Sequence, residues 1–270
     1  MIKSYGVRET TAVGTEAERH AEEIRLCGFT VLRGVVRAEY LDAARAGLDR
    51  LYAEQAAAAG GADRLARIND ANIVRCPLAQ DDLFLELVTQ PRLLAVAAAL
   101  LGEYFVLQQQ NGVINPPAGD NYQAAWHRDL PYQHFVSSRP LALSALVCID
   151  PFTAETGGTC VLPGSHKSEQ FPSADYVRAH ERGAVGDPGD VLVFDSMLYH
   201  RAGTNRSGRL RRGLNNVLGL PLLQQQISLP RALGGRFAED PFLRKFLGYE
   251  TEPAGSSFEW RGRRLEKLAG

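Results

Sequence analysis

The chain has 270 residues, 45% of them hydrophobic and 23% charged, and its 30 Lys and Arg nearly balance its 31 Asp and Glu, giving a formal net charge of −1. A nucleic-acid-binding protein that depends on counterion release usually carries a large basic excess, so this balance argues against such a partner. The composition is also too apolar and too evenly charged for a disordered chain. A chain of this length buries about three quarters of its unfolded surface, and we expect residues 1–270 to form a single domain.

Cysteine usage and apolar stretches bear on where the protein works. The four cysteines are sparse and form no CxxC pair, which is typical of reduced thiols in a cytosol. Residues 1–10 lack the apolar run of a signal peptide. The longest apolar stretch, residues 93–101, is far shorter than the ~20 residues that cross a bilayer. We therefore expect a cytoplasmic protein with no membrane partner.

The first hundred residues have the pattern of helices around one short strand. In chain order, the predicted elements are a helix over residues 15–26, a strand over 29–36, a helix over 38–59 and a helical block over 81–101. Pro91 is expected to break the last block, and Gly102 to end it. We expect residues 1–102 to form a helical N-terminal layer.

Short strands follow, punctuated by Pro, Gly and Asn. The predicted strands cover residues 104–115, 122–129, 141–150, 159–162, 190–195 and 211–220. Their intervals suit a sandwich or barrel better than βαβ units. Residues 103–220 are thus the expected β core, with a polar surface insertion at 167–186. Residues 221–270 form a C-terminal extension, in which a helix over 241–247 precedes a loose basic tail.

One pair of side chains in this β region has the chemistry of a metal site. His127 and Asp129 point the same way if they lie on a strand, because alternate residues share a face. His200 follows the apolar strand at 190–195 and can supply a third ligand. Two imidazoles and one carboxylate form the facial triad that holds Fe(II) with open coordination positions. An oxygenase needs those positions for a bidentate co-substrate and for O₂.

A His-x-Asp pair alone is common by chance, and a partnered or surface histidine is its usual explanation. The added signal is Arg211, eleven residues after His200, at the start of the next apolar strand. From there a guanidinium can reach the far carboxylate of a dicarboxylate bound to the metal. Such forked contacts are strong when shielded from water.

Together these motifs resemble the phytanoyl-CoA dioxygenase-like family of Fe(II)/2-oxoglutarate-dependent oxygenases. The similarity rests on His127-Arg128-Asp129, on His200 with Arg211, and on the run TGGTCVLPGSHK at residues 156–167. It implies a mainly β fold of the double-stranded β-helix type (a jelly roll, cupin-like) behind the N-terminal α layer. It also implies that His127, Asp129 and His200 bind Fe(II) and that Arg211 binds 2-oxoglutarate.

The chain departs from the family pattern at Ala202, where many members carry a serine that helps to bind the co-substrate. Thr204 or a residue of the 108–115 strand is expected to replace it. Gln109 and Asn111 share a face of that strand and are our candidates, since an unpaired buried amide is costly. Asp129 is present, whereas related halogenases replace this carboxylate, so hydroxylation is favoured over halogenation.

The candidate substrate residues are polar and aromatic, namely Tyr132, Gln133, His134, Gln224 and Gln226. They favour a small polar metabolite, hydroxylated at a C–H bond with release of succinate and CO₂. Demethylation, desaturation and epoxidation stay open as outcomes. The oligomeric state is open too, because the apolar segment at 218–223 suits either a core or a subunit contact.

A second class of function fits the same fold. A cupin-type metal-dependent isomerase, or a non-catalytic metal-binding jelly-roll protein, would also carry a His-Asp-His site. Arg211 separates the classes, because neither alternative needs a buried anchor for a dicarboxylate at this position. Succinate formation coupled to O₂ use would distinguish them in the test tube.

Overall fold

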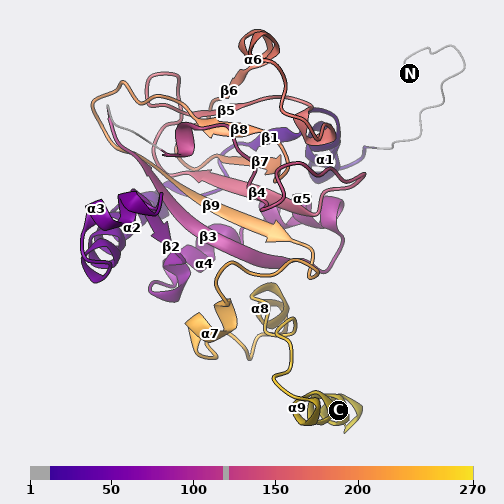
Figure 1. The fold of residues 1–270 in the computed structure, drawn as a ribbon. Coiled ribbons are helices and arrows are strands. Elements are labelled where there is room, and N and C mark those ends of the chain that lie inside the picture. Colours follow the sequence, from indigo (N-terminus) through magenta and orange to yellow (C-terminus); the bar gives the residue numbers. More distant parts are fainter. Residues whose placement is uncertain (1–12, 118–121, 270) are drawn as a thin grey trace, which may run out of the picture.

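The structure is a computed structural model that describes residues 13–117 and 122–269. In these residues the strands form two antiparallel sheets, one with the order β1-β7-β4-β9-β3-β2 and a smaller one with the order β6-β5-β8 (Figure 1). The strands are β1 (Phe29–Leu32), β2 (Ile73–Arg75), β3 (Val106–Asn115), β4 (Ala142–Cys148), β5 (Thr159–Val161), β6 (Arg182–Ala184), β7 (Val191–Asp195), β8 (His200–Ala202) and β9 (Arg211–Gly219). The expected mainly β fold with an N-terminal helical layer is confirmed.

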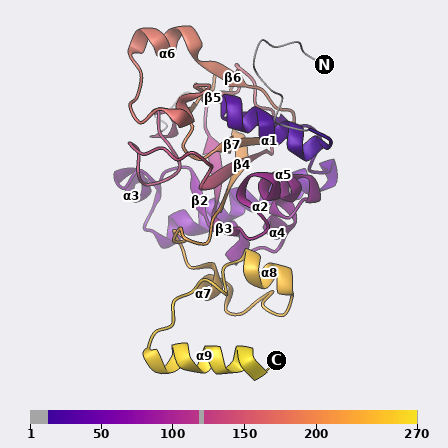
Figure 2. The ribbon, with the colours of Figure 1, turned by 90° about the vertical axis from the view of Figure 1, so that its right-hand side faces the viewer.

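The N-terminal helices cover one face of the large sheet (Figure 2). They are α1 (Glu16–Cys27), α2 (Ala38–Ala58), α3 (Ala62–Arg67), α4 (Leu83–Val88) and α5 (Pro91–Leu101). Leu48 of α2 and Leu93 of α5 are fully buried in one cluster with Leu214 of β9. Because strand residues alternate between faces, Arg211 and Asn215 of β9 point to the opposite face, toward the small sheet.

Local sequence signals explain where these helices begin and end. Thr15 caps α1, its hydroxyl accepting from the Glu18 N–H while the Glu18 carboxylate accepts from the Thr15 N–H. Pro91 begins α5 rather than kinking a longer helix, since its missing N–H costs nothing in the first turn. The helical block predicted over 81–101 is therefore two helices, and α5 ends before Gly102 as expected.

Residues 122–129 differ from the expected strand. They form a 3₁₀ turn (Tyr122–Ala124) and then an extended segment that makes a single bridge, between His127 and His200. The reason is that β8 is only three residues long and already pairs with β5. His127 and Asp129 nevertheless direct their side chains into one cluster with His200, and the Asp129 N–H donates to the Ser196 carbonyl.

The two segments expected to be irregular also contain secondary structure. Residues 167–186 carry α6 (Ala174–His180) and β6, and β6 pairs with β5, so the end of the predicted surface insertion belongs to the small sheet. The C-terminal extension contains α7 (Leu229–Leu233) and α8 (Pro241–Phe246), and its tail forms α9 (Ser257–Ala269) instead of a loose segment. This last helix stands apart from the sheets (Figure 2). None of the described helices is long and apolar enough to cross a membrane.

Asp195, at the end of β7, makes the stability of the fold depend on pH. Burial raises the pKa of its carboxyl group to about 6 from 3.8, so between these values the folded protein keeps a proton that the unfolded chain has lost. This group's contribution to stability therefore falls as the pH rises from about 4 to 6. An asparagine at this position still accepts from the Met197 N–H but does not ionise. We therefore expect Asp195→Asn to abolish this loss of stability with rising pH.

Urea titrations at several pH values would measure this effect. The free energy of unfolding of Asp195→Asn minus that of the native protein should increase with pH, by up to about 3 kcal/mol at pH 8. A difference between the two proteins that is constant from pH 4 to pH 8 would contradict the prediction.

Candidate metal centre

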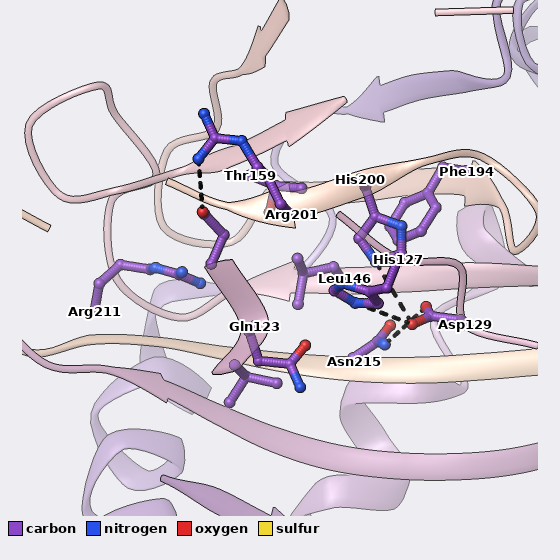
Figure 3. Close-up of a pocket in the computed structure, with 12 residues that line it drawn as sticks. Gln123, His127, Asp129, Leu146, Thr159, Phe194, His200, Arg201, Arg211 and Asn215 are labelled. Carbon is purple, nitrogen blue, oxygen red and sulfur yellow. Dashed lines mark hydrogen bonds and ion pairs between the residues drawn. The ribbon is translucent and has the colours of Figure 1, made fainter. Parts of the chain in front are cut away.

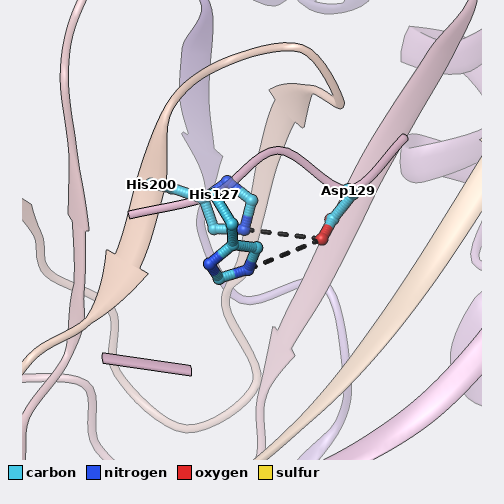
Figure 4. A group of neighbouring side chains, drawn as sticks. All are labelled: His127, Asp129 and His200. Atoms are coloured by element: carbon cyan, nitrogen blue, oxygen red, sulfur yellow. Dashed lines mark ion pairs between the residues drawn. The ribbon is translucent and has the colours of Figure 1, made fainter. Parts of the chain in front are cut away.

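Three side chains from two distant parts of the chain meet between the sheets (Figure 4). His127 and Asp129 lie on the extended segment after the Tyr122–Ala124 turn, and His200 begins β8. Two backbone hydrogen bonds of 3.0 Å join His127 to His200. The Oδ1 atom of Asp129 lies 3.9 Å from Nε2 of His127 and 3.5 Å from Nε2 of His200. One potential ligand atom from each residue lies within 4.8 Å of the others.

Backbone carbonyls orient both imidazoles. Nδ1 of His127 lies 2.8 Å from the Ala125 carbonyl oxygen, and Nδ1 of His200 lies 3.0 Å from that of Leu198. A carbonyl oxygen only accepts, so each Nδ1 carries the proton and each Nε2 presents its lone pair to the centre. The ring of Phe194 packs 4.6 Å from that of His200. The three residues thus form a preorganised set of two nitrogens and one oxygen.

The charges of the three side chains depend on one another. Burial alone would raise the pKa of Asp129, but the two histidines and the Ser144 hydroxyl favour its charged form and hold the pKa well below its usual value. Burial opposes protonation of His200, yet the Asp129 carboxylate outweighs it and raises the pKa of this imidazole. At His127 burial and the neighbouring His200 dominate, and the pKa is lowered. The carboxylate stays ionised, as a metal ligand must.

A partly open cavity joins this cluster to Arg211 on β9 (Figure 3). Its lining, apart from the three clustered residues and Arg211, consists of Val113, Gln123, Leu146, Thr159, Phe194, Arg201, Ala202 and Asn215. The arginine is only 2% exposed, and burial lowers the pKa of its guanidinium to about 10. Arg211 stacks over the Phe152 ring at 4.3 Å.

Arg211 lacks a counter-ion in the described part of the chain. Its Nη2 donates to the Gly157 carbonyl at 3.1 Å, but its buried Nε has no partner there. Gly157 adopts a φ of +70°, and a Cβ at this position would lie 2.4 Å from the Gly203 carbonyl oxygen, so the turn requires glycine. A buried cation without a counter-ion is costly, which indicates that an anion completes the site.

The cavity includes residues that the sequence reading did not select. Thr159 of β5 pairs with Ala202 of β8 in the register of the small sheet, so the threonine stands beside the position where the family serine is missing. Asn215 shares a face of β9 with Arg211 four residues earlier, a period-two signal that could have revealed it. Gln123 lies on the Tyr122–Ala124 turn, and its side chain is drawn toward the cavity in Figure 3.

Several sequence candidates lie elsewhere. Gln109, Asn111 and Gln226 line a separate, smaller cavity beside Cys76. Gln109 and Asn111 lie on β3, where a bulge between Leu107 and Gln109 shifts the register with β9, and Gln226 lies between β9 and α7.

Four further candidates lie outside both cavities. Thr204 is exposed because it follows the end of β8. Tyr132, His134 and Gln224 are exposed too.

The Gln133 side chain is bonded to backbone groups. Its Oε1 accepts from the Arg128 N–H at 3.0 Å, and its Nε2 donates to the carbonyls of Arg128 and Leu130. These three bonds hold the loop that follows the metal-site segment. The side chain is therefore committed to the backbone.

Comparison with known proteins agrees with the motifs. The family model described as phytanoyl-CoA dioxygenase (PhyH) matches residues 24–213. Uncharacterized protein Rv1501 of Mycobacterium tuberculosis is 32% identical over 227 residues, which are 82% of this chain and 81% of that protein. The iron/alpha-ketoglutarate-dependent dioxygenase penM of Penicillium thymicola is 26% identical over 166 residues, or 58% of this chain and 51% of that protein.

Solved structures agree with the jelly-roll expectation. EctD from S. alaskensis with bound Fe is similar with a TM-score of 0.61 and 25% identity, covering 75% of this chain and 76% of that one. The resemblance inferred from the motifs is confirmed. The chain therefore belongs to the phytanoyl-CoA dioxygenase family, and it is a non-haem iron enzyme that depends on 2-oxoglutarate.

Proposed function

We propose that the protein hydroxylates a C–H bond of a small polar molecule, with His127, Asp129 and His200 holding iron and Arg211 holding 2-oxoglutarate. The observation that carries this proposal is a buried Arg211 cation with no counter-ion among the described residues, at one end of a cavity whose other end is the His-Asp-His cluster. The bound iron supplies the oxidative chemistry by which O₂, 2-oxoglutarate and R–H become succinate, CO₂ and R–OH.

The donor set of the cluster suits iron. Two neutral imidazole nitrogens and one ionised carboxylate oxygen are the ligands of the facial triad of non-haem iron oxygenases. Both Nε2 atoms and Oδ1 of Asp129 face one another, so the three residues need little rearrangement to bind a cation. The Ala125 carbonyl orients the His127 ring, and the Leu198 carbonyl orients the His200 ring. Because the rings are already in place, metal binding costs less conformational entropy.

Arg211 and Thr159 suit the far carboxylate of 2-oxoglutarate. A carboxylate provides the counter-ion that Arg211 lacks and an acceptor for its Nε–H. The Thr159 hydroxyl, beside Ala202 on the small sheet, is the donor that we assign in place of the family serine. This replaces the earlier expectation of Thr204, Gln109 or Asn111 in that role.

The remaining lining supports a small substrate with a few polar groups. Gln123 and Asn215 contribute amides to the cavity, whereas Val113, Leu146 and Phe194 contribute apolar contacts. Small-molecule sites commonly combine an apolar wall with a few polar groups that fix orientation. We also propose a cytoplasmic location, which suits four cysteines that are all free thiols.

Anaerobic reconstitution tests the proposal. Adding Fe(II) and 2-oxoglutarate to the native protein should produce a visible metal-to-ligand charge-transfer band, and His200→Ala should abolish it because one of three ligands is lost. His180→Ala, which removes an exposed histidine on α6, is the matched control and should keep the band. The absence of a band in the native protein, or an undiminished band in His200→Ala, would contradict the proposal. Metal binding without O₂-dependent succinate formation would favour the cupin-type alternative.

A further inference from the structure

The two oxygens of the Asp129 carboxylate have different surroundings. Oδ1 faces the Nε2 atoms of His127 and His200. Oδ2 points away from them and accepts two hydrogen bonds, from the Ser144 hydroxyl at 2.5 Å and from the Asn215 side-chain amide at 3.1 Å (Figure 3 shows the latter residue beside Asp129). One oxygen is therefore free to bind a cation, and the other is occupied by donors.

Ser144 is rigidly placed. It lies in the middle of β4, pairs with Phe194 of β7 and Val217 of β9, and is fully buried. Its hydroxyl oxygen also lies 2.8 Å from that of Ser196, which is equally buried. With Ser196 donating to Ser144, the Ser144 proton goes to Asp129. Because strands on both sides of β4 hold Ser144 in place, its hydroxyl cannot follow the Asp129 carboxylate if that group rotates.

The orientation of Asn215 is set by the carboxylate. Its Nδ2 donates to Oδ2 of Asp129, while its buried Oδ1 has no hydrogen-bond partner in the described residues. The opposite rotamer would place Oδ1 against a negatively charged oxygen. A buried amide oxygen without a partner is costly, and this amide leaves its own in that state in order to donate to Asp129, which indicates a role beyond local packing.

We propose that Ser144 and Asn215 are positioning residues that hold Oδ2 of Asp129 and so restrict the carboxylate to one-oxygen coordination of the metal. The inference rests on the iron site proposed above. A facial triad offers three open positions only while its carboxylate uses one oxygen. If Oδ2 also bound the metal, it would take a position that 2-oxoglutarate or O₂ needs.

Co(II) titration of the metal-free protein tests this inference without relying on turnover. In Ser144→Ala and Asn215→Ala the freed Oδ2 raises the coordination number of the metal, so the ligand-field bands of the Co(II) protein should weaken. Affinity of the Co(II) protein for 2-oxoglutarate should fall about tenfold, at the lower end of the 10- to 100-fold effects of such outer partners. If Ser144→Ala does not fold, Asn215→Ala, at a half-buried position, carries the test.

Two matched controls separate positioning from stability. Ser165→Ala removes the same hydroxyl group, and Asn216→Ala the same amide, from buried residues that do not contact Asp129. Both should keep native Co(II) spectra and 2-oxoglutarate affinity even where their melting temperatures fall. Native spectra and affinity in Ser144→Ala and Asn215→Ala would overturn the inference. A native protein that binds neither Co(II) nor Fe(II) would instead overturn the proposed iron site.

Discussion

Replacing Arg211 by Met is expected to weaken 2-oxoglutarate binding strongly and, at the same time, to stabilise the ligand-free fold. Arg211 is a buried cation with no counter-ion among the described residues. Replacing buried charges by apolar side chains of similar volume is often stabilising, here by about 1–4 kcal/mol. The Gly157 carbonyl does not become an unpaired acceptor, because the Asn115 side-chain amide also donates to it. Loss of the guanidinium should weaken 2-oxoglutarate binding by about 3 kcal/mol, or roughly 100-fold.

Urea titration and calorimetric titration with 2-oxoglutarate measure the two effects separately. Arg212→Met is the matched control, since this neighbouring arginine pairs with Asp49 and Asp150 on the other side of β9. It should lose stability and keep 2-oxoglutarate affinity, the reverse of Arg211→Met. Thr159→Val, which removes only a hydroxyl, should weaken binding by about tenfold. Equal destabilisation of both arginine variants would refute the assignment of Arg211 as an anion anchor.

Arg128→Met is expected to cause the largest loss of stability. This arginine lies between two of the metal-site residues, is 3% exposed, and stacks 3.9 Å from the Tyr199 ring. It donates to four backbone carbonyls, namely those of Gln133, Phe135, Ser165 and Ser168. The Gln133 and Phe135 carbonyls belong to one loop, and the Ser165 and Ser168 carbonyls belong to another. The Gln133 carbonyl keeps the Tyr199 hydroxyl as a donor, and the Ser165 carbonyl keeps the Ser168 N–H. Loss of the donor to the other two carbonyls should cost about 3 kcal/mol.

Thermal and urea unfolding would measure this loss. Arg178→Met removes an exposed arginine of α6 that forms an ion pair with Asp175, and should change stability by no more than about 0.5 kcal/mol. Arg128→Lys should recover only part of the loss, because an ammonium group cannot span both loops as a planar guanidinium does. A variant Arg128→Met as stable as Arg178→Met would show that the carbonyls find other donors.

The sequence predicts the β core well where strands are long and apolar. β4 and β7 lie inside the runs expected for them because each strand is buried throughout and reads as a continuous apolar segment. The predictions are wrong where pairing with another strand determines the local structure. β6 is three residues long and two of them are exposed, so only its pairing with β5 makes it a strand. Residues 122–129 make one bridge, from His127 to His200, because β8 is only three residues long.

The candidate site divides in the same way. His127, Asp129, His200 and Arg211 were selectable because their residue types and spacing carry the chemistry. Ser144 was hidden inside an apolar strand, and Thr159 gained interest only from its register with Ala202. Choosing among Gln109, Asn111 and Thr204 required the bulge in β3 and the end of β8. Those features depend on strand pairing across long stretches of chain, which a local pattern does not contain.

The pairing of β3 with β9 has a consequence for how the protein folds. Asn115 lies opposite Arg211, so the central ladder closes across nearly a hundred residues, and such non-local pairing slows folding. During synthesis β3 leaves the ribosome before β9, so one edge of β3 is unpaired until β9 follows. An exposed strand edge of this kind is prone to association with other chains. The strand that carries Arg211 arrives last, so 2-oxoglutarate can stabilise only the closed sheet. Its presence during refolding should therefore raise the yield of folded protein without speeding the early steps.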